Sequence, residues 1–253
     1  MKLIRDTWLV YSRQIGLVIR QPTWVFIMLI QPLYYLILFG PLLNGLEGMP
    51  GFEAGAMETF VPGLVIMMAM FGTLFSGFGL IAEIREGVIE RFRVTPISRL
   101  ALLLGRSLRD VTTLVFQALV LVLLSSPIGG LTIHWDGLAL MMLIVIGIGL
   151  ALSAASYGVA IVLKSEDALA PLLNTVTQPV LLLSGIMLPM ALAPDWLQTV
   201  AKFNPFAYAV DAARALFTGD LASNAIWQAS VFIGALMVLL VFWSARKFSR
   251  AAA

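Results

Sequence analysis

Long apolar runs, each about the length that crosses a lipid bilayer, dominate this sequence. A bilayer core is spanned by about 20 apolar helical residues, and hydrophobic residues make up 60% of the chain against 12% charged residues. That ratio excludes a soluble globular protein of 253 residues. We therefore expect an all-α polytopic membrane protein, a single domain over residues 1–253 with six transmembrane helices, at residues 24–43, 60–81, 107–127, 138–163, 168–188 and 226–243.

The first 21 residues predict a different kind of helix, because charges interrupt them throughout. Ile4, Trp8 and Tyr11 fall on one helical face, and Asp6 falls on the other with most of the basic residues. Such a pattern is typical of a helix that lies along a membrane surface, where Trp and Tyr are favoured. We assign residues 1–21 to an interfacial amphipathic helix in contact with lipid.

Basic residues are distributed unevenly between the two sides of the predicted spans. Fourteen of the sixteen Lys and Arg residues fall in the amino-terminal segment, the second-to-third and fourth-to-fifth connections, and the carboxyl tail, and only Lys202 and Arg214 fall opposite. The positive-inside rule then places both termini in the cytoplasm. Because these basic residues flank apolar spans, the net charge of +2 does not indicate nucleic-acid binding.

The residues that most enzymes use are scarce. The chain has no cysteine and one histidine, His134, which we expect to be a polar residue at the outer surface. No G-x-x-x-x-G-K-[ST] motif occurs, so the chain does not bind ATP through a P-loop. We expect a protein that is not an enzyme, with no catalytic residue, metal or cofactor of its own. No Lys or carboxylate lies in the centre of a span, which argues against an ion-coupled carrier.

The connection between the second and third spans, residues 83–96, is rich in charges of both signs. Ile84, Val88 and Phe92 recur at four-residue spacing and form an apolar helical stripe. We interpret the segment as a short helix whose charged side binds a soluble partner. A solvated loop that obeys the positive-inside rule is the alternative, although acidic residues are not needed for orientation. The candidate contact residues are Glu83, Glu86, Val88, Glu90, Arg91, Phe92, Arg93 and Pro96.

Two separated regions carry a family resemblance. The sequence ERFRVTPISR at 90–99, followed by LLLGR at 102–106, resembles ABC type-2 exporter permeases, particularly the daunorubicin-resistance and nodulation-factor export branches. The sequences LLLSGIMLP at 181–189, PDWL at 194–197 and FNPFAYAVDAAR at 203–214 are similar to that family's broken fifth span and re-entrant outer helices. The resemblance extends over essentially the whole chain in the family's order.

The resemblance implies a transport function. In such a permease the 83–96 segment is the coupling helix, which contacts a separate P-loop ATPase present in two copies, and ATP and Mg²⁺ bind there. A second permease subunit, in the simplest case a homodimer partner, and the cell membrane of a prokaryote are also implied. The expected substrate is amphipathic or hydrophobic, such as a drug, natural product or lipid-like molecule. A polysaccharide or glycolipid exporter of the same fold, and less readily an ion-coupled carrier, are the alternatives.

Candidate pathway residues come from the second and fifth spans. Met and Phe side chains in the second span are adaptable and suit an apolar substrate, although a lipid-facing position or core packing is the favoured explanation. Breaks in the fifth span persist where protein shields the freed carbonyls or where they line a cavity, and a harmless kink is the alternative. The candidates are Met67, Met70, Phe71, Phe75, Pro179 and Ser184.

The connection after the fifth span predicts short helices. We expect Asp195 to cap a helix over 196–203 and a second helix, over 206–218, to stop at Gly219. These outer re-entrant helices, 195–218, contain the residues of interest Trp196, Asn204, Pro205, Asp211 and Arg214.

Helical spacing also predicts specific contacts. Arg106 with Asp110, at i, i+4, and Asp211 with Arg214, at i, i+3, are expected to pair. Small residues along the fourth span, including Gly147 and Gly158, predict close helix packing within the subunit in preference to a dimer contact.

Overall fold

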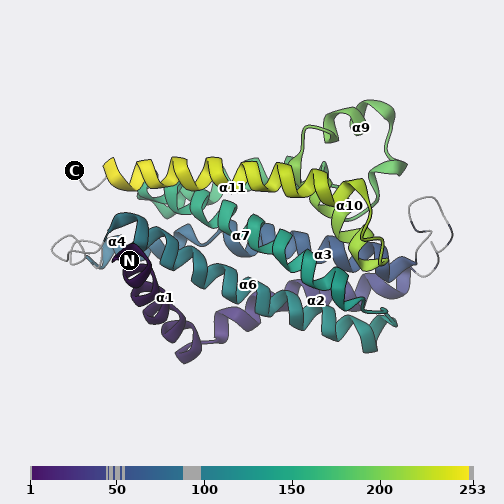
Figure 1. Cartoon of the computed structure of the whole chain (residues 1–253), viewed down its shortest axis with the longest axis horizontal. Coiled ribbons are helices and arrows are strands. Elements are labelled where there is room, and N and C mark those ends of the chain that lie inside the picture. Colours follow the sequence, from purple (N-terminus) through teal and green to yellow (C-terminus); the bar gives the residue numbers. More distant parts are fainter. Residues whose placement is uncertain are drawn as a thin grey trace.

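A computed structural model describes residues 2–43, 45, 48, 52, 55–87 and 98–250. Over these residues the protein is an elongated bundle of helices that run mostly along its long axis (Figure 1). The elements are α1 (Lys2–Arg20), α2 (Thr23–Leu43), α3 (Ala56–Leu74), α4 (Gly77–Arg85), α6 (Arg99–Gly129), α7 (Trp135–Leu163), α8 (Glu166–Leu182), the 3₁₀ turn η2 (Met190–Leu192), α9 (Asp195–Ala201), α10 (Pro205–Phe217) and α11 (Asn224–Arg250).

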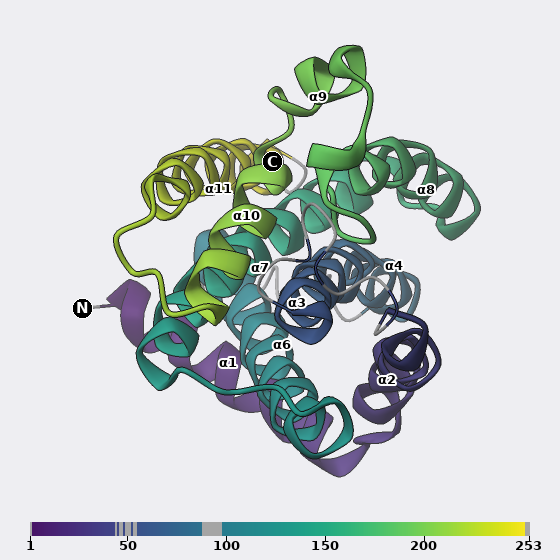
Figure 2. The ribbon, with the colours of Figure 1, turned by 90° about the vertical axis from the view of Figure 1, so that its right-hand side faces the viewer.

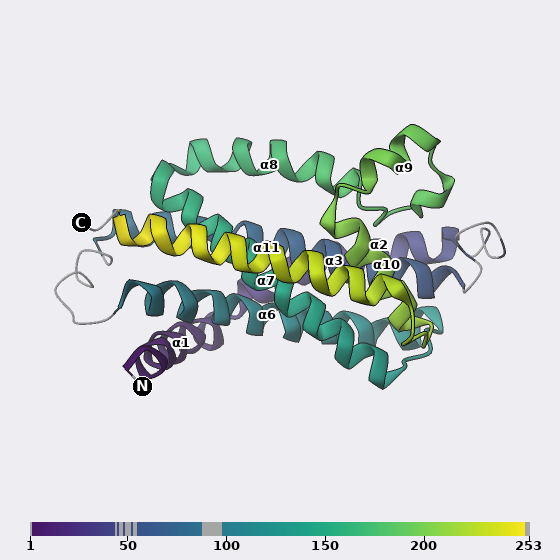
Figure 3. The same cartoon turned by 45° about the horizontal axis from the view of Figure 1, so that its top comes forward.

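The two ends of the bundle differ in content. The end that holds both chain termini also holds α1 and α4 (Figure 1). The opposite end holds the short helices α9 and α10, which stand between α8 and α11 (Figures 1 and 3). The segments that carry most basic residues therefore gather at one end of the molecule.

Helix α3 lies in the middle of the bundle, as the end-on view in Figure 2 shows. Its sequence, AMETFVPGLVIMMAMFGTL, is apolar on all sides, which is typical of a buried helix. Most of its side chains are buried, and it packs against α7, α6, α10 and α2. The main core cluster of the protein is built around it.

The predicted second span is a single run over 60–81, whereas the structure divides it into α3 and α4 at Phe75–Ser76. The hydroxyl of Thr73 donates to the carbonyl oxygen of Ala69 at 2.7 Å, and that of Ser76 donates to the oxygen of Thr73 at 2.8 Å. Hydroxyl groups bonded back to the preceding turn bend helices. The break thus follows from local side-chain chemistry that a hydropathy average does not register.

Five helical stretches in the described residues are long and apolar enough to cross a membrane, namely 23–43, 56–85, 99–128, 135–163 and 224–248. They correspond to the predicted first, second, third, fourth and sixth spans, so the all-helical fold is confirmed for these residues. The predicted fifth span is occupied by α8, which has 17 residues and ends at Leu182. Gly185, with a φ of 73°, follows in a turn and ends the helix before the predicted boundary at 188.

Helices α7 and α11 pack closely through glycines. A side chain at Gly147 would lie 3.0 Å from Ile233, and one at Gly158 would collide with the Trp243 ring. The small residues of the fourth span therefore serve packing within one chain, as the sequence predicts.

Helix α1 lies at the end of the bundle and packs against α6 (Figure 1). A Cβ atom at Gly105 would lie 2.7 Å from the Cβ of Val10, so glycine permits the close approach. Trp8 is 64% exposed, which leaves its side of α1 available to lipid. Asp6, on the face opposite Trp8, is turned toward the protein and is 4% exposed.

Candidate functional site

The predicted coupling segment lies only partly within the described residues. Val88, Glu90, Arg91, Phe92, Arg93 and Pro96 fall outside them. Glu83 lies in the last turn of α4, and Glu86 is the exposed residue that follows the helix. Helix α6 begins at Arg99, where the hydroxyl of Ser98 accepts a hydrogen bond from the backbone N–H of Ala101 at 3.1 Å.

An ion pair joins the two helices on either side of this segment. The guanidinium of Arg106, in α6, bonds to the carboxylate of Glu83 in α4. The Arg106 side chain is 3% exposed and that of Glu83 is 24% exposed. Gln14 of α1 donates to the same carboxylate at 3.3 Å. These contacts tie α1, α4 and α6 together beside the predicted coupling segment.

The predicted pairing of Arg106 with Asp110 is wrong. Asp110 instead bonds to its neighbour Arg109 and accepts a hydrogen bond from the hydroxyl of Tyr157 at 2.5 Å. Arg109 also donates to the Tyr157 hydroxyl at 3.1 Å. Because Tyr157 comes from α7 and is 1% exposed, this second polar cluster fixes α7 against α6.

The junction between α3 and α4 is held by α7. The backbone N–H of Gly77 donates to the hydroxyl of Ser156 at 2.9 Å. A Cβ atom at Gly77 would lie 2.7 Å from that oxygen, so any side chain there would push α4 away from α7. The polar contacts near the predicted coupling segment thus extend from α1 through α6 and α7 to the start of α4.

The candidate pathway residues of the second span differ in how deeply they are buried. Met67 and Met70 are buried in the core of a single chain, at 3% and 2% exposure. Phe71 and Phe75 are half-buried and stack with ring centroids 6.1 Å apart. Phe78 continues the stack at 5.9 Å from Phe75, so these aromatic rings form a continuous ladder across the α3–α4 junction.

The two candidates of the predicted fifth span, Pro179 and Ser184, differ in exposure. Pro179 is exposed on α8, at the edge of the bundle (Figure 3). Ser184 is buried and its hydroxyl donates to the carbonyl oxygen of Leu181 at 2.6 Å. The turn after α8, which contains Ser184, packs against α3, because a Cβ atom at Gly63 would lie 2.5 Å from the carbonyl oxygen of Ile186, whereas Pro179 is exposed.

At the opposite end of the molecule, Arg214 of α10 joins three segments. Its guanidinium donates to the carbonyl oxygen of Thr59 in α3 at 3.0 Å and to that of Gly185 at 2.7 Å. Asp211 lies 3.9 Å from the same guanidinium, which confirms the predicted pair. The two carbonyl oxygens that Arg214 contacts belong to residues distant in sequence, and no helical spacing rule predicts these contacts.

Helix α10 begins at Pro205, one residue before the predicted start at 206. The side-chain oxygen of Asn204 accepts a hydrogen bond from the N–H of Phe206 at 3.0 Å, and Pro205 occupies the first turn. The side-chain nitrogen of Asn204 donates to the carbonyl oxygen of Val180 at 2.7 Å and ties α10 to α8. Trp196 is 68% exposed on α9.

One expectation for the outer end is wrong. Asp195 is the first residue of α9 and does not cap it, since Pro194 occupies the capping position. His134 is exposed, as expected, and its Nδ1 also lies 3.0 Å from the carbonyl oxygen of Phe217. A carbonyl oxygen only accepts, so Nδ1 is the donor, and this bond fixes the start of α7 to the end of α10.

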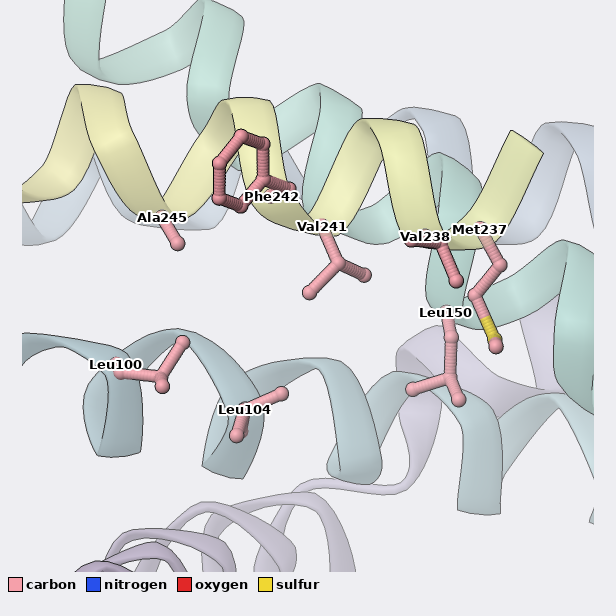
Figure 4. A pocket seen from close by; sticks show the side chains of 8 residues that line it. All are labelled: Leu100, Leu104, Leu150, Met237, Val238, Val241, Phe242 and Ala245. Atoms are coloured by element: carbon pink, nitrogen blue, oxygen red, sulfur yellow. The ribbon is translucent and has the colours of Figure 1, made fainter. Parts of the chain in front are cut away.

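A groove between α6 and α11 is lined only by apolar side chains and has a volume of about 450 Å³. Figure 4 shows leucines of α6 directed toward α11, and side chains of α11 directed back across the gap. The lining residues are Leu100, Leu104, Leu150, Met237, Val238, Val241, Phe242 and Ala245. Among the residues that the structure describes, no cluster of three or more His, Cys, Asp or Glu side chains could hold a metal ion.

Comparison with known proteins decides the family. Residues 5–218 match the sequence model of the family described as ABC-2 type transporter. The chain belongs to the ABC-2 type transporter family. The resemblance seen in the sequence is therefore confirmed, and the matched range runs from α1 to the end of α10.

Relatives of this ABC-2 chain include a daunorubicin resistance ABC transporter permease protein, DrrB1, from Streptomyces coeruleorubidus. It is 28% identical over 204 residues, covering 78% of this chain and 70% of that protein. A protein named as the transport permease ycf38, from Cyanophora paradoxa, is 24% identical over 231 residues, covering 88% of this chain and 80% of the relative. ABC-2 family membership, permease relatives and the apolar helices together identify a membrane transport protein.

Proposed function

We propose that this chain is the membrane-spanning subunit of an ATP-driven exporter, powered by a separate P-loop ATPase. Two ATPase copies would hold ATP and Mg²⁺, and this chain would supply no catalytic residue or cofactor. The observation that carries the proposal is the ion pair between Glu83, the first residue of the predicted coupling segment, and Arg106, which lies in α6 beyond the other end of that segment. A force applied to that segment would reach α4 and α6 together, and α7 through the Asp110–Tyr157 bond.

The proposal includes six spans with both termini in the cytoplasm of a prokaryotic cell. Five spans correspond to the long apolar helices. Helix α8, at 1.5 Å per residue, is about 26 Å long, and residues 183–188 would complete the crossing as part of the outer re-entrant structure. The placement of both termini at one end of the bundle supports this topology (Figure 1).

Pairing with a second permease subunit, in a homodimer, is part of the same proposal. Helix α8 lies at the edge of the bundle and packs against α7 and α4 through one side, including Leu169 and Leu173 (Figure 3). Its other side carries exposed apolar residues, among them Val176 at 58% exposure. A pathway between two copies would then be bordered by α8 and the half-buried Phe71–Phe75–Phe78 ladder.

The proposed substrate is amphipathic or hydrophobic. The daunorubicin-resistance relative supports this class, as do the apolar and aromatic side chains of the α3–α4 junction. The polysaccharide-exporter alternative differs in substrate and not in architecture, so one transport assay separates the two.

The test is ATP-dependent transport by the permease co-purified with its ATPase in sealed vesicles. We expect uptake of an anthracycline into inside-out vesicles that requires ATP and the ATPase, with two copies of each subunit in the complex. Transport of a lipid-linked glycan in place of the drug would establish the polysaccharide alternative. Transport driven by an ion gradient without the ATPase, or ATP hydrolysis by the isolated permease, would contradict the proposal.

A sequence-based variant tests the coupling segment directly. Phe92→Ala removes the aromatic residue predicted to anchor the segment, and truncation of a buried interface aromatic often costs a few kcal/mol of binding free energy. We expect weaker assembly with the ATPase or loss of substrate-stimulated ATP hydrolysis. Assembly, hydrolysis and transport equal to those of the parent would show that residues 83–96 are a solvated loop.

A further inference from the structure

The groove between α6 and α11 is accessible from the side of the bundle. Val238 and Phe242, on one edge, are 63% and 54% exposed, whereas Leu100, Leu104 and Val241 are half-buried. Figure 4 shows Val241 directed across the gap toward α6, where Leu100 and Leu104 are directed back toward it. A molecule in the surrounding membrane could therefore enter sideways, without passing through the core around α3.

The size and the apolar lining of the groove favour a hydrocarbon ligand. Its volume of about 450 Å³ is roughly three times that of a cavity of about 150 Å³ that stays dry and binds benzene. All eight lining residues are apolar, so a polar group placed among them would lose its hydrogen bonds with water and gain none. A flexible alkyl chain suits this space.

Positive charge gathers at one end of the groove. Val238, Phe242 and Arg246 follow one another at four-residue spacing along α11, and the Arg246 guanidinium carbon lies 4.1 Å from the centroid of the Phe242 ring. Lys247 lies beside it, with its amine 5.8 Å from the Trp243 ring. On the facing helix, Arg99 is the first residue of α6 and precedes Leu100 of the lining.

These three cations lie at the end of the bundle that holds both chain termini (Figure 1). The amino-terminal end of α6, with its positive helix dipole, lies at the same end. An apolar slot that leads to a cluster of cations matches a ligand with a hydrocarbon tail next to an anionic group.

We propose that the α6–α11 groove binds one acyl chain of an anionic phospholipid, with the lipid phosphate held by Arg246 and Arg99. The cytoplasmic leaflet is rich in anionic lipid, which basic residues near its surface attract. The site rests on the proposed cytoplasmic position of the termini, but not on the ATPase or on export. It lies away from the candidate pathway residues of α3 and α8.

The test is photolabelling of the purified full-length chain in detergent. The probe is phosphatidylglycerol with a diazirine in one acyl chain, and phosphatidylcholine with the same chains is the comparison. We expect crosslinks concentrated in peptides containing Leu100–Leu104 and Met237–Ala245, with unlabelled phosphatidylglycerol the better competitor. Equal labelling of the exposed surface of α2, or equal competition by the two lipids, would overturn the proposal.

Variants separate the groove from the general membrane-facing surface. Val241→Trp, or the smaller change Ala245→Leu, fills the groove and should reduce its labelling several-fold. Leu239→Trp places the same ring on α11 at a residue that is 65% exposed and outside the groove, and it should leave labelling unchanged. Monodispersity and helicity are measured for each variant, and unchanged labelling of folded Val241→Trp or Ala245→Leu protein would overturn the proposal.

Charge variants test the phosphate contact. Arg246→Gln should lower the preference for phosphatidylglycerol about fivefold, the effect of one cationic side chain at an anionic surface, and Arg246→Lys should keep most of it. Arg20→Gln, an exposed basic residue at the end of α1, is the matched control. If Cys residues introduced together at Leu104 and Val241 form disulfides between chains, a second copy occupies the groove and the proposal fails.

Because no nucleotide or ATPase is present in these measurements, their outcome is independent of the exporter proposal. A chain that transports but is not labelled would refute only the lipid site. A chain that is labelled with the expected lipid preference but does not transport would refute only the proposed function.

Discussion

Glu83 of α4 and Arg106 of α6 form an ion pair that joins the two helices on either side of the predicted coupling segment. The Arg106 side chain is almost fully buried. An unpaired buried charge is costly, so neither helix moves away without a large loss of free energy. The pair thus makes α4 and α6 respond as one unit to a partner that contacts the residues between them.

Replacing Glu83 by Gln should destabilise the protein, because it leaves the Arg106 charge buried without its partner. We expect a loss of about 3 kcal/mol in the free energy of unfolding, measured by denaturation in detergent. Within the proposed complex, ATP hydrolysis should also respond less to substrate. Arg85→Gln is the matched control, since it removes an exposed pair with Glu166 at 3.1 Å, of a kind worth about 1 kcal/mol or less. Similar losses for both variants would contradict the role given to the buried pair.

Tyr157→Phe should weaken the contact between α6 and α7. The change keeps the ring but removes the hydroxyl that donates to Asp110 at 2.5 Å and accepts from Arg109. Loss of a buried hydrogen-bond partner costs about 1–3 kcal/mol, and thermal unfolding of the purified chain measures it. Tyr34→Phe, at a residue 62% exposed on α2, should shift stability by no more than about 0.5 kcal/mol. A melting temperature unchanged by Tyr157→Phe would show that Asp110 finds another donor.

Two glycines of the same helix should respond in opposite directions to alanine. In Gly77→Ala the new methyl would lie 2.7 Å from the Ser156 hydroxyl oxygen, and overpacking of this kind costs about 1–3 kcal/mol. In Gly79→Ala the methyl meets no atom within 4 Å, and alanine in a helix is favoured over glycine by about 0.5–1 kcal/mol. Thermal stability of the two variants is compared directly. A stabilising Gly77→Ala would mean that α4 does not pack tightly on α7.

Arg214→Lys should loosen the outer end while keeping the charge. The guanidinium reaches the carbonyl oxygens of Thr59 and Gly185 together, and a lysine amine does not reproduce that planar fork. We expect faster hydrogen exchange in residues 183–194 with little change in α6. Arg20→Lys at an exposed position serves as control. Equal exchange in parent and variant would show that the turn after α8 is held by other contacts.

Cysteine labelling tests the proposed topology without background, because the chain has no cysteine of its own. Asp167→Cys lies at the start of α8 and Ala222→Cys lies between α10 and α11, and both positions are exposed. In intact cells a membrane-impermeant maleimide should label Ala222→Cys, and Asp167→Cys only after permeabilisation. The reverse pattern would invert the orientation inferred from the basic residues.

Local sequence rules placed the second outer helix at 206–218, within one residue of α10 (Pro205–Phe217), but they did not predict its tertiary contacts. Asn204-Pro205 and Gly219 are strong signals because capping and positive φ depend on neighbouring backbone groups. The contacts of Arg214 with Thr59 and Gly185 depend on three segments meeting in space, and no periodicity encodes that meeting. The same holds for the α6–α11 groove, whose lining comes from α6, α7 and α11.

The sequence by itself determined the class of protein and the location of its helices. Apolar runs long enough for a bilayer must become helices there, because a helix satisfies its own backbone hydrogen bonds, and this held for the stretches that include 24–43 and 138–163. The tertiary structure decided which charges pair. Helical spacing made Asp110 an available partner for Arg106, but Glu83 of α4 and Tyr157 of α7 reach these side chains more closely. In a buried site the closest well-oriented partner gives the strongest interaction, and only the packing of separate helices determines which residue that is.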